Sequence, residues 1–388
     1  MSATRYRCSK TDLIPFQGIG TTADPFFFAM DEYFWFALKS IPHVGNHTFR
    51  RLVQHFGTPE RVLSASEREL AMVRGISSAS ISSLLTHDPS NEAERECQSL
   101  KRSGARIVNL LSPDYPPLLL QIPDPPPFLY VKGELRLSEM SIAIVGSRRA
   151  SPYGISTAEK MARELARHGV TVVSGMARGV DTTAHRAAVA EGGGTIGVLG
   201  CGVDIVYPPE NRELFNDMAT KGALVSEFPM GTRPLAENFP RRNRVISGMC
   251  RGVLVVEAAE RSGSLITAQC ALEQGRDIFA IPGNIHSMNS RGVHRLIKEG
   301  AKLVERVEDI MEELSGKPFR SDDPPPLIRL CFSPCEASIY SLLSATPLHI
   351  DEIAAKCALT VADVSAILLR LELSGVIIQH PGMLFSLA

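Results

Sequence analysis

The segment Ser141–Gly154, which reads SIAIVGSRRASPYG, decides the fold of this chain. Its run Ile142–Val145 is short and entirely apolar, which predicts a buried strand. Ser151 is a favourable N-cap and Pro152 suits the first turn of a helix, so a helix is expected to begin directly after the turn. A strand that passes through a tight turn into a helix is the unit from which parallel α/β sheets are built.

The same alternation of apolar runs and helical stretches continues to about residue 304. Crossovers between parallel strands are right-handed, so the alternation predicts an α/β fold with a doubly wound, Rossmann-like parallel sheet. The predicted strands are Ile142–Val145, Val170–Ser174, Thr195–Leu199, Ala223–Ser226, Gly252–Glu257, Asp277–Ala280 and Lys302–Val304. The predicted helices are Tyr153–Arg167, Asp181–Glu191, Glu210–Lys221, Arg242–Met249, Ile266–Gln274 and Val293–Glu299.

The segments on either side of this pattern have a different character. The N-terminal part has a helical period with Gly-containing hairpins, and the C-terminal part has three short helices followed by two strands, the order of a winged helix. A Pro-rich passage separates the latter from the sheet. The predicted organisation is an extension at 1–30, a helical helix-hairpin-helix or SAM-like module at 31–106, a Rossmann-like domain at 107–315, a linker at 316–335 and a winged-helix domain at 336–388.

Composition excludes several classes of protein. The chain has 388 residues, 44% of them hydrophobic, and 41 Lys and Arg against 42 Asp and Glu give a net charge of -1. A globally basic coat of nucleic acid is therefore excluded, whereas a local basic face is not. No apolar run reaches the roughly 18–20 residues of a membrane helix, and no secretion signal is recognised, so the expected location is the cytoplasm without membrane attachment.

The eight cysteines fit reduced and mostly buried thiols. A zinc site could be formed from Cys331, Cys335, His349 and Cys357, but no CxxC pair is present. Core or linker cysteines are the favoured interpretation, and no metal or cofactor is expected.

Four turns between predicted strands and helices combine small residues with exposed backbone amides or cations. Such turns suit phosphate groups. In a doubly wound sheet the turns lie on one rim, so a phosphate-bearing ligand that spans several of them is expected. Phe239 and the nearby Tyr153, Tyr207 and Phe228 suit stacking on bases, although packing in the core is the commoner role of a single aromatic side chain. The candidate phosphate-binding residues are Gly146, Ser147, Arg148, Arg149, Ser174, Gly175, Arg178, Gly179, Phe239, Arg241, Arg242, Asn243, Arg244, Gly263 and Ser264.

The flanking modules leave alternatives open. The hairpin Ile41–Gly45 can point helix amides at a phosphate, but a helical packing module without a ligand explains the same pattern. The predicted third helix of the winged-helix domain has Arg370 as its only cation, so a role in packing or protein interaction is favoured over DNA binding.

Several long motifs, in this order along the chain, resemble the DprA (Smf) family of DNA-processing proteins. They cover the α/β domain from about Pro113 to Val304. The resembling segments are Ile142–Gly154, Ser174–His185, Gly193–Gly202, Tyr207-Pro208, Phe239–Arg244, Ser262–Ala268, Gly275-Arg276 and Ile281–Gly283.

The resemblance implies a bacterial cytoplasmic protein that binds and protects single-stranded DNA and forms a homodimer through its Rossmann-like domain. It further implies loading of the recombinase RecA onto incoming DNA during natural transformation. Carried over by motif, Arg148 in Ile142–Gly154 is the phosphate-contacting arginine, and Arg178 is the cation of Ser174–His185. The motif Phe239–Arg244 supplies Arg241, Arg242, Asn243 and Arg244. No catalytic residue is implied.

An enzyme is the alternative. Phosphoribohydrolases of the lysine-decarboxylase-like type cleave nucleoside monophosphates with a glutamate that soon follows a Gly-rich turn. Here the comparable turn is Ser262–Ala268 and the next carboxylate is Glu273, which does not fall in that place. Asp181 with His185 is the best remaining acid–base pair, although capping and packing explain both.

Overall fold

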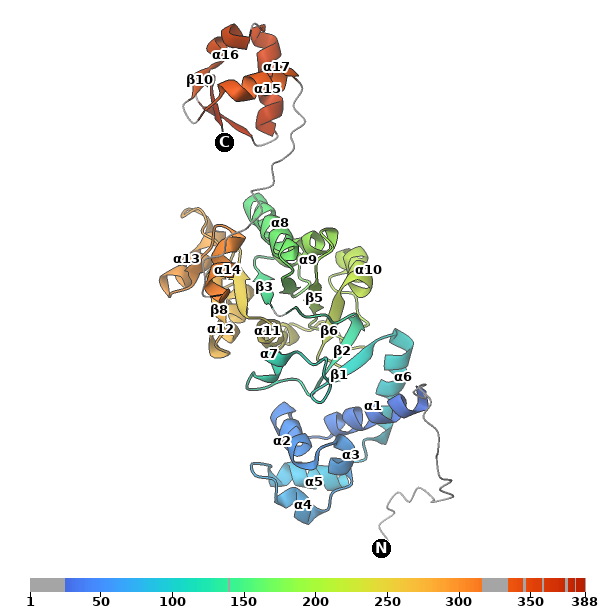
Figure 1. Ribbon diagram of the computed structural model, residues 1–388. Coiled ribbons are helices and arrows are strands. Elements are labelled where there is room, and N and C mark those ends of the chain that lie inside the picture. Colours follow the sequence, from blue (N-terminus) through green and yellow to red (C-terminus); the bar gives the residue numbers. More distant parts are fainter. Residues whose placement is uncertain are drawn as a thin grey trace. The chain divides into compact units, whose positions relative to one another are not determined.

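The computed structural model describes residues 25–138, 140–315, 334–344, 347–357, 359–373, 376–380 and 382–387. The chain divides into two compact units, Met1–Phe319 and Arg320–Ala388, which are described one at a time (Figure 1).

The first unit is built on a mixed sheet of nine strands, counted over the described residues, in the order β1-β2-β6-β5-β4-β3-β7-β8-β9. Strands β3 to β9 run parallel, which confirms the predicted fold class. The central strands β3 to β7 are buried along their whole length, as a sheet covered on both faces requires. Their bounds are β3 Ser141–Val145, β4 Thr171–Ser174, β5 Thr195–Val198, β6 Ala223–Ser226, β7 Gly252–Val255, β8 Asp277–Ala280 and β9 Lys302–Leu303.

Two strands at one edge were not predicted. β1 (Arg106–Asn109) pairs antiparallel with β2 (Phe128–Gly133), and β2 pairs antiparallel with β6. The Pro-rich passage between them, with the short helix α7 (Pro117–Leu120), returns the chain so that β2 continues the sheet. Only the register shows this pairing, because four to six apolar residues after prolines do not by themselves specify a partner strand.

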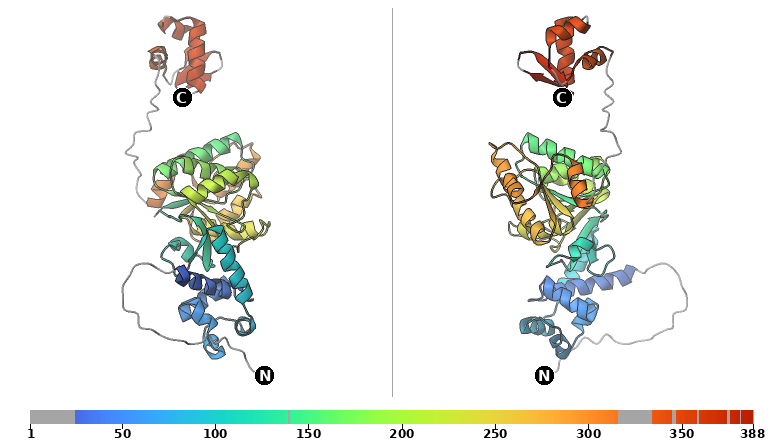
Figure 2. Two further views of the ribbon diagram at one scale, coloured as in Figure 1. Left: turned by 90° about the vertical axis from the view of Figure 1, so that its right-hand side faces the viewer. Right: turned by 60° about the vertical axis from the view of Figure 1, so that its left-hand side comes forward.

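The strand order reverses between β3 and β7. From β3 the chain proceeds through β4, β5 and β6 in one direction, and β7, β8 and β9 then lie on the other side of β3. Helices therefore cover both faces of the sheet (Figure 2). The helices on the first face are α8 (Pro152–Arg167), α9 (Val180–Ala190), α10 (Arg212–Lys221) and α14 (Val307–Ser315), and those on the second are α7, α11 (Asn238–Gly248), α12 (Gly263–Glu273) and α13 (Arg291–Lys298).

Six helices precede the sheet, and the first of them packs against it. The Phe36 ring in the first helix stacks on Tyr130 of β2 with ring centroids 5.9 Å apart, and Trp35 contacts Phe128 edge to face. Because these aromatic side chains belong to one buried cluster, the helices and the sheet share a core. The helices are α1 (Pro25–Ser40), α2 (Asn46–Phe56), α3 (Pro59–Leu63), α4 (Glu67–Ala71), α5 (Ser78–Thr86) and α6 (Ser90–Ser103).

Helix α1 begins at Pro25, inside the segment predicted as an extension; residues 1–24 of that segment lie outside the described residues. The hairpin helices follow the capping rules, with Thr58 and Ser77 as N-caps and a capping box between Ser66 and Glu69.

The second unit has the predicted winged-helix fold, with one strand, β10, that was not predicted between the first two helices. A three-stranded sheet of order β10-β12-β11 packs with three helices around buried Ile353, Val364 and Phe385. Most of the predicted linker, including Cys331, lies outside the described residues, within which no group of three metal-ligating side chains is found. The elements are α15 (Pro334–Leu342), β10 (Leu348–His349), α16 (Ile350–Cys357), α17 (Val361–Leu373), β11 (Ile377–His380) and β12 (Leu384–Leu387).

No helix among the described residues is both long and apolar enough to span a membrane.

One buried polar contact fastens α9 to the sheet. The Thr195 hydroxyl donates to the Val172 carbonyl oxygen at 2.9 Å, so its oxygen accepts from Nδ1 of His185 at 2.7 Å. His185 is fully buried, and burial lowers its pKa to about 3, which keeps the imidazole neutral near pH 7.

This burial predicts acid sensitivity. The folded pKa of His185 lies below the ordinary value of about 6.5, so between these values the unfolded chain binds a proton that the folded chain does not. His185 therefore stabilises the fold fully above pH 6.5 and progressively less as pH falls, by about 2 kcal/mol at pH 5. The variant His185→Gln is expected to have a lower free energy of unfolding than wild type at pH 7. Because the variant lacks the titrating imidazole, this difference between the two proteins should be about 2 kcal/mol smaller at pH 5. Urea unfolding followed by fluorescence of Trp35, the only tryptophan, measures it; a pH-independent difference contradicts the prediction.

Candidate nucleic-acid interface

A groove of about 760 Å³ lies where the strand order reverses, outside the carboxyl ends of β3 and β7. This is the place at which doubly wound sheets bind ligands. The turn after β3 forms one wall, and the turn before α12 and the first turns of α11 form the others. The exposed cations Arg148, Arg149 and Arg261 line it, and Asp181 is the only acid among its described lining residues. The groove is therefore positively charged.

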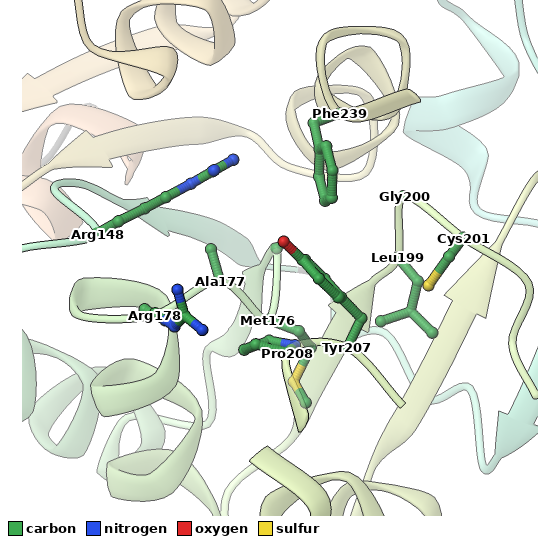
Figure 3. Close-up of a pocket in the computed structure, with 11 residues that line it drawn as sticks. Arg148, Met176, Ala177, Arg178, Leu199, Gly200, Cys201, Tyr207, Pro208 and Phe239 are labelled. Atoms are coloured by element: carbon green, nitrogen blue, oxygen red, sulfur yellow. The ribbon is translucent and has the colours of Figure 1, made fainter. Parts of the chain in front are cut away.

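A smaller hollow adjoins the groove at Arg148 and Phe239 (Figure 3). The Arg148 guanidinium lies 5.3 Å from the centroid of the Phe239 ring, which also contacts Tyr207 at 5.6 Å between ring centroids. Figure 3 shows the Tyr207 hydroxyl pointing toward the space between Arg148 and Phe239. A cation and two aromatic rings thus meet at one point, an arrangement suited to a phosphate next to a stacked base.

The motif Phe239–Arg244 is helical, which corrects the prediction of a turn. Helix α11 begins at Asn238, four residues before the predicted start, and Pro240 is tolerated because it lies in the first turn. The helix gives successive arginines different directions, and so different environments.

Arg242 points into the protein. Its side chain is 3% exposed, and its guanidinium donates to the carbonyl oxygens of Gly175, directly after β4, and Val198, the last residue of β5. Arg242 was predicted as a phosphate ligand. The structure instead gives it internal partners, although its edge still lines the groove beside Phe239.

Arg244 also has partners within the chain. It pairs with the carboxylate of Glu227 and with Asp124, whose backbone oxygen accepts a further hydrogen bond from it. Its side chain is 18% exposed. Arg241 is exposed and lies over the Phe228 ring, 5.5 Å from the centroid. Of the three arginines in this motif, only Arg241 presents its charge to solvent.

Asp181 fills the predicted anion site of the turn that follows β4, Gly175–Gly179. Its Oδ2 accepts from the amides of Gly175 at 3.1 Å and Ala177 at 3.3 Å. The N-cap position belongs to Gly179, and Asp181, predicted as the cap, lies in the first turn of α9. Burial raises the pKa of Asp181 to about 6, against the lowering effect of nearby Arg242. An external phosphate would have to displace this carboxylate.

Gly179 allows the turn after β4 to pack closely against the turn after β3. Its φ is +74°, and a Cβ there would meet the Ser147 carbonyl oxygen at 2.3 Å. The neighbouring Arg178 is exposed and forms an ion pair with Glu210, which offsets its charge.

A second internal carboxylate occupies the N-terminus of α8. Glu257, 3% exposed, accepts from the backbone amide of Ser151 at 2.9 Å and from its hydroxyl. The Ser151 oxygen in turn accepts from the Gly154 amide. The amides expected to bind phosphate beside Arg148 are thus satisfied within the chain. The N-terminus of α12 differs, because Gly263 is exposed and lines the groove directly.

Most predicted site residues therefore lie close together: some line the groove, some line the smaller hollow, and a few lie outside both linings. Sequence reasoning missed Arg261 and Glu257 as parts of the site; an acid directly after an apolar strand run was the available signal for Glu257. The groove and hollow bring together Gly146, Ser147, Arg148, Arg149, Gly175, Arg178, Phe239, Arg242, Asn243, Gly263 and Ser264. Outside their linings lie Ser174, Gly179, Arg241 and Arg244.

The residues considered for catalysis have structural partners. Glu273 is at the opposite end of α12 from the groove and accepts from Gln269. Asp181 and His185 are buried and bond to different groups, the loop amides and Thr195. Asp181 and His185 therefore do not act as a hydrogen-bonded acid–base pair, and Asp181, which lines the groove, already accepts from two backbone amides.

Three models of known protein families match this chain. A family model described as DNA recombination-mediator protein A matches residues 106–315, a DprA winged helix domain matches 320–383, and a helix-hairpin-helix motif matches 33–89. Protein Smf of Synechocystis is 32% identical over 91% of this chain and 98% of its own length. Protein Smf of Escherichia coli is 43% identical over 76% of this chain and 80% of its own.

Two solved structures of DNA processing protein A superpose on this chain. The DNA processing protein A (DprA) of Streptococcus pneumoniae superposes with a TM-score of 0.64 at 36% identity, covering 74% of this chain and 99% of that one. That of Helicobacter pylori, described with a single-stranded DNA binding mode, gives 0.50 at 29% identity, covering 55% and 98%. From the motifs, the sheet and these matches we conclude that the chain belongs to the DprA (Smf) family of DNA-processing proteins.

Proposed function

We propose that the chain binds single-stranded DNA along the groove at the carboxyl ends of β3 and β7. The observation that carries the proposal is the separation of charge at this rim. The acids Asp181 and Glu257 are buried and bonded to backbone amides, whereas Arg148, Arg149 and Arg261 are exposed. Among the described residues these three arginines have no ion pair across the groove. The family relative from Helicobacter pylori, whose structure is described in terms of single-stranded DNA binding, supports the same ligand.

Physical arguments favour a single strand over a duplex. Each phosphate that an arginine neutralises releases counterions, so affinity falls with salt. A single strand can bend into the narrow space between Arg148 and Phe239, and its unpaired bases can stack on Phe239 and Tyr207. Duplex bases are already stacked on each other and its phosphates follow a stiff helix. Binding through backbone and stacking contacts should show little sequence preference overall.

We further propose, from the family, that the bound strand is protected and handed to the recombinase RecA in the cytoplasm during natural transformation. The matching family model is described as a recombination mediator, which supports this role. The chemistry favours binding over catalysis, since the groove presents cations and no accessible acid or base pair.

The binding proposal predicts a specific loss in Arg148→Ala. Fluorescence anisotropy of a labelled 20-nucleotide single strand should show affinity lower by about tenfold or more, and a plot of log K against log salt flatter by about 0.7, the value for one phosphate contact. The matched control is Arg186→Ala, an exposed residue of α9, which removes equal charge outside the groove. Wild-type protein should bind a 20-base-pair duplex more weakly than the strand.

Two results contradict the proposal. One is equal loss in Arg148→Ala and Arg186→Ala, which would indicate a diffuse charge effect. The other is duplex binding as tight as strand binding, which would move DNA recognition to the helical or winged-helix segments.

The mediator role predicts that wild-type protein accelerates RecA filament formation on a single strand covered with single-strand-binding protein. Arg148→Ala should lose this acceleration in proportion to its lost affinity, while Arg186→Ala retains it. The measurement is the DNA-dependent ATPase rate of RecA. A wild-type protein that leaves this rate unchanged contradicts the mediator role and leaves strand binding intact.

We also propose a homodimer, on the family resemblance alone. Light scattering after size exclusion should give twice the monomer mass of 42.2 kDa. A mass of one chain at micromolar concentration would refute it.

A further inference from the structure

A second hollow of about 520 Å³ lies beside the groove and has no place in the function proposed above. The turns after β3, β7 and β8 form both the groove and this hollow. Asn289 separates them: it lines the groove, and its Nδ2 donates to the Arg149 carbonyl oxygen at 3.3 Å and to Glu257 Oε2 at 3.5 Å. One residue thus links Glu257 of the hollow to the backbone of Arg149 in the groove.

The charge of this hollow is opposite to that of the groove. The carboxylate of Glu257 lines it, and its described lining residues include no Lys, Arg or His. A buried carboxylate without a facing cation repels phosphate strongly, because little water screens it. The hollow thus excludes the DNA backbone and accepts a neutral group.

Glu257 has spare capacity to accept hydrogen bonds. The structure gives it the amide and hydroxyl of Ser151 and the Nδ2 of Asn289 as donors. An ionised carboxylate offers about four acceptor positions, so one remains. The group that this position favours is an N–H or amino donor on the ligand.

The remaining lining suits a flat ring. Tyr153 is 51% exposed, and its hydroxyl donates to the Pro282 carbonyl oxygen at 2.7 Å, which fixes the ring at the hollow. A fixed aromatic face stacks on any base. The hydroxyls of Ser287 and Ser290 also line the hollow and can donate to ring nitrogens or carbonyl oxygens of that base.

We infer that this hollow takes one nucleobase of the bound strand and prefers a base with an amino group, namely cytosine, adenine or guanine, over thymine. The inference rests on the proposed single-strand binding. The amino group of such a base donates to Glu257 while the phosphates stay on the arginines. Thymine has no amino group, and its single donor, N3–H, lies between O2 and O4, so a carboxylate that accepts from it is held against two acceptors.

The test compares two labelled homopolymers, (dC)20 and (dT)20, because a homopolymer presents the same base whatever the register of binding. Wild-type protein should bind (dC)20 about fivefold more tightly at equal salt, the value of one modest hydrogen bond. Both strands should show the same salt slope, because the same arginines hold their phosphates.

Two variants separate the hollow from the fold. Glu257→Gln replaces the carboxylate by an amide that can also donate to thymine O4, so the preference should fall to about one. Because Glu257 also caps α8, Ser287→Leu is the second variant: it fills the hollow from the loop after β8 and leaves Glu257 intact. The matched control is Ile285→Ser on the same loop, a side chain that is 75% exposed and does not line the hollow.

Loss of the preference in both hollow variants, with the salt slope and the Ile285→Ser control unchanged, supports the inference. Equal wild-type affinity for the two strands overturns it while single-strand binding stands. A preference that survives Ser287→Leu also overturns it. If neither strand binds with a salt dependence that Arg148→Ala reduces, the inference falls together with the proposed function.

Discussion

The buried guanidinium of Arg242 is the contact on which the candidate interface depends. It bonds to the carbonyl oxygens at the ends of β4 and β5, and so fixes the rim of the sheet at that point. A buried cation requires a compensating charge, and Asp181 supplies it from the first turn of α9. The same Asp181 oxygen bonds to the amides of Gly175 and Ala177. One buried pair thus orders the loop beside Arg148.

Internal carboxylates account for the form of the groove. Parallel α/β sheets place helix N-termini and exposed amides along one rim, and each of these attracts an anion. Here Asp181 and Glu257 satisfy two of these positions from within the chain. The acids lie below the surface and the arginines above it, so the rim is basic although the chain as a whole has a net charge of -1. A flexible polyanion meets only the basic side.

The helices before the sheet are connected to the same framework. Glu96 of α6 accepts from the Tyr130 hydroxyl at 2.6 Å and from the Met230 amide at 2.8 Å, which joins the helical region to the segment after β6. Arg244 of α11, the helix whose first turns line the groove, forms an ion pair with Glu227 in that segment. The helical region is therefore fixed relative to the sheet by half-buried hydrogen bonds as well as by the shared aromatic core.

The sequence alone determined the parallel strands and most helices, because short apolar runs between turn residues and N-caps depend on neighbours close in the chain. Strand β6, for example, has the predicted bounds Ala223–Ser226. It also placed Arg148, Phe239 and Gly263 on one rim, since that follows from topology. Only the tertiary structure decided which arginines face solvent. Arg241, Arg242 and Arg244 are alike in sequence, yet Arg242 and Arg244 meet buried acceptors that come from the turn after β4, from β5 and from the segment after β6. Such partners, distant along the chain, leave no local pattern.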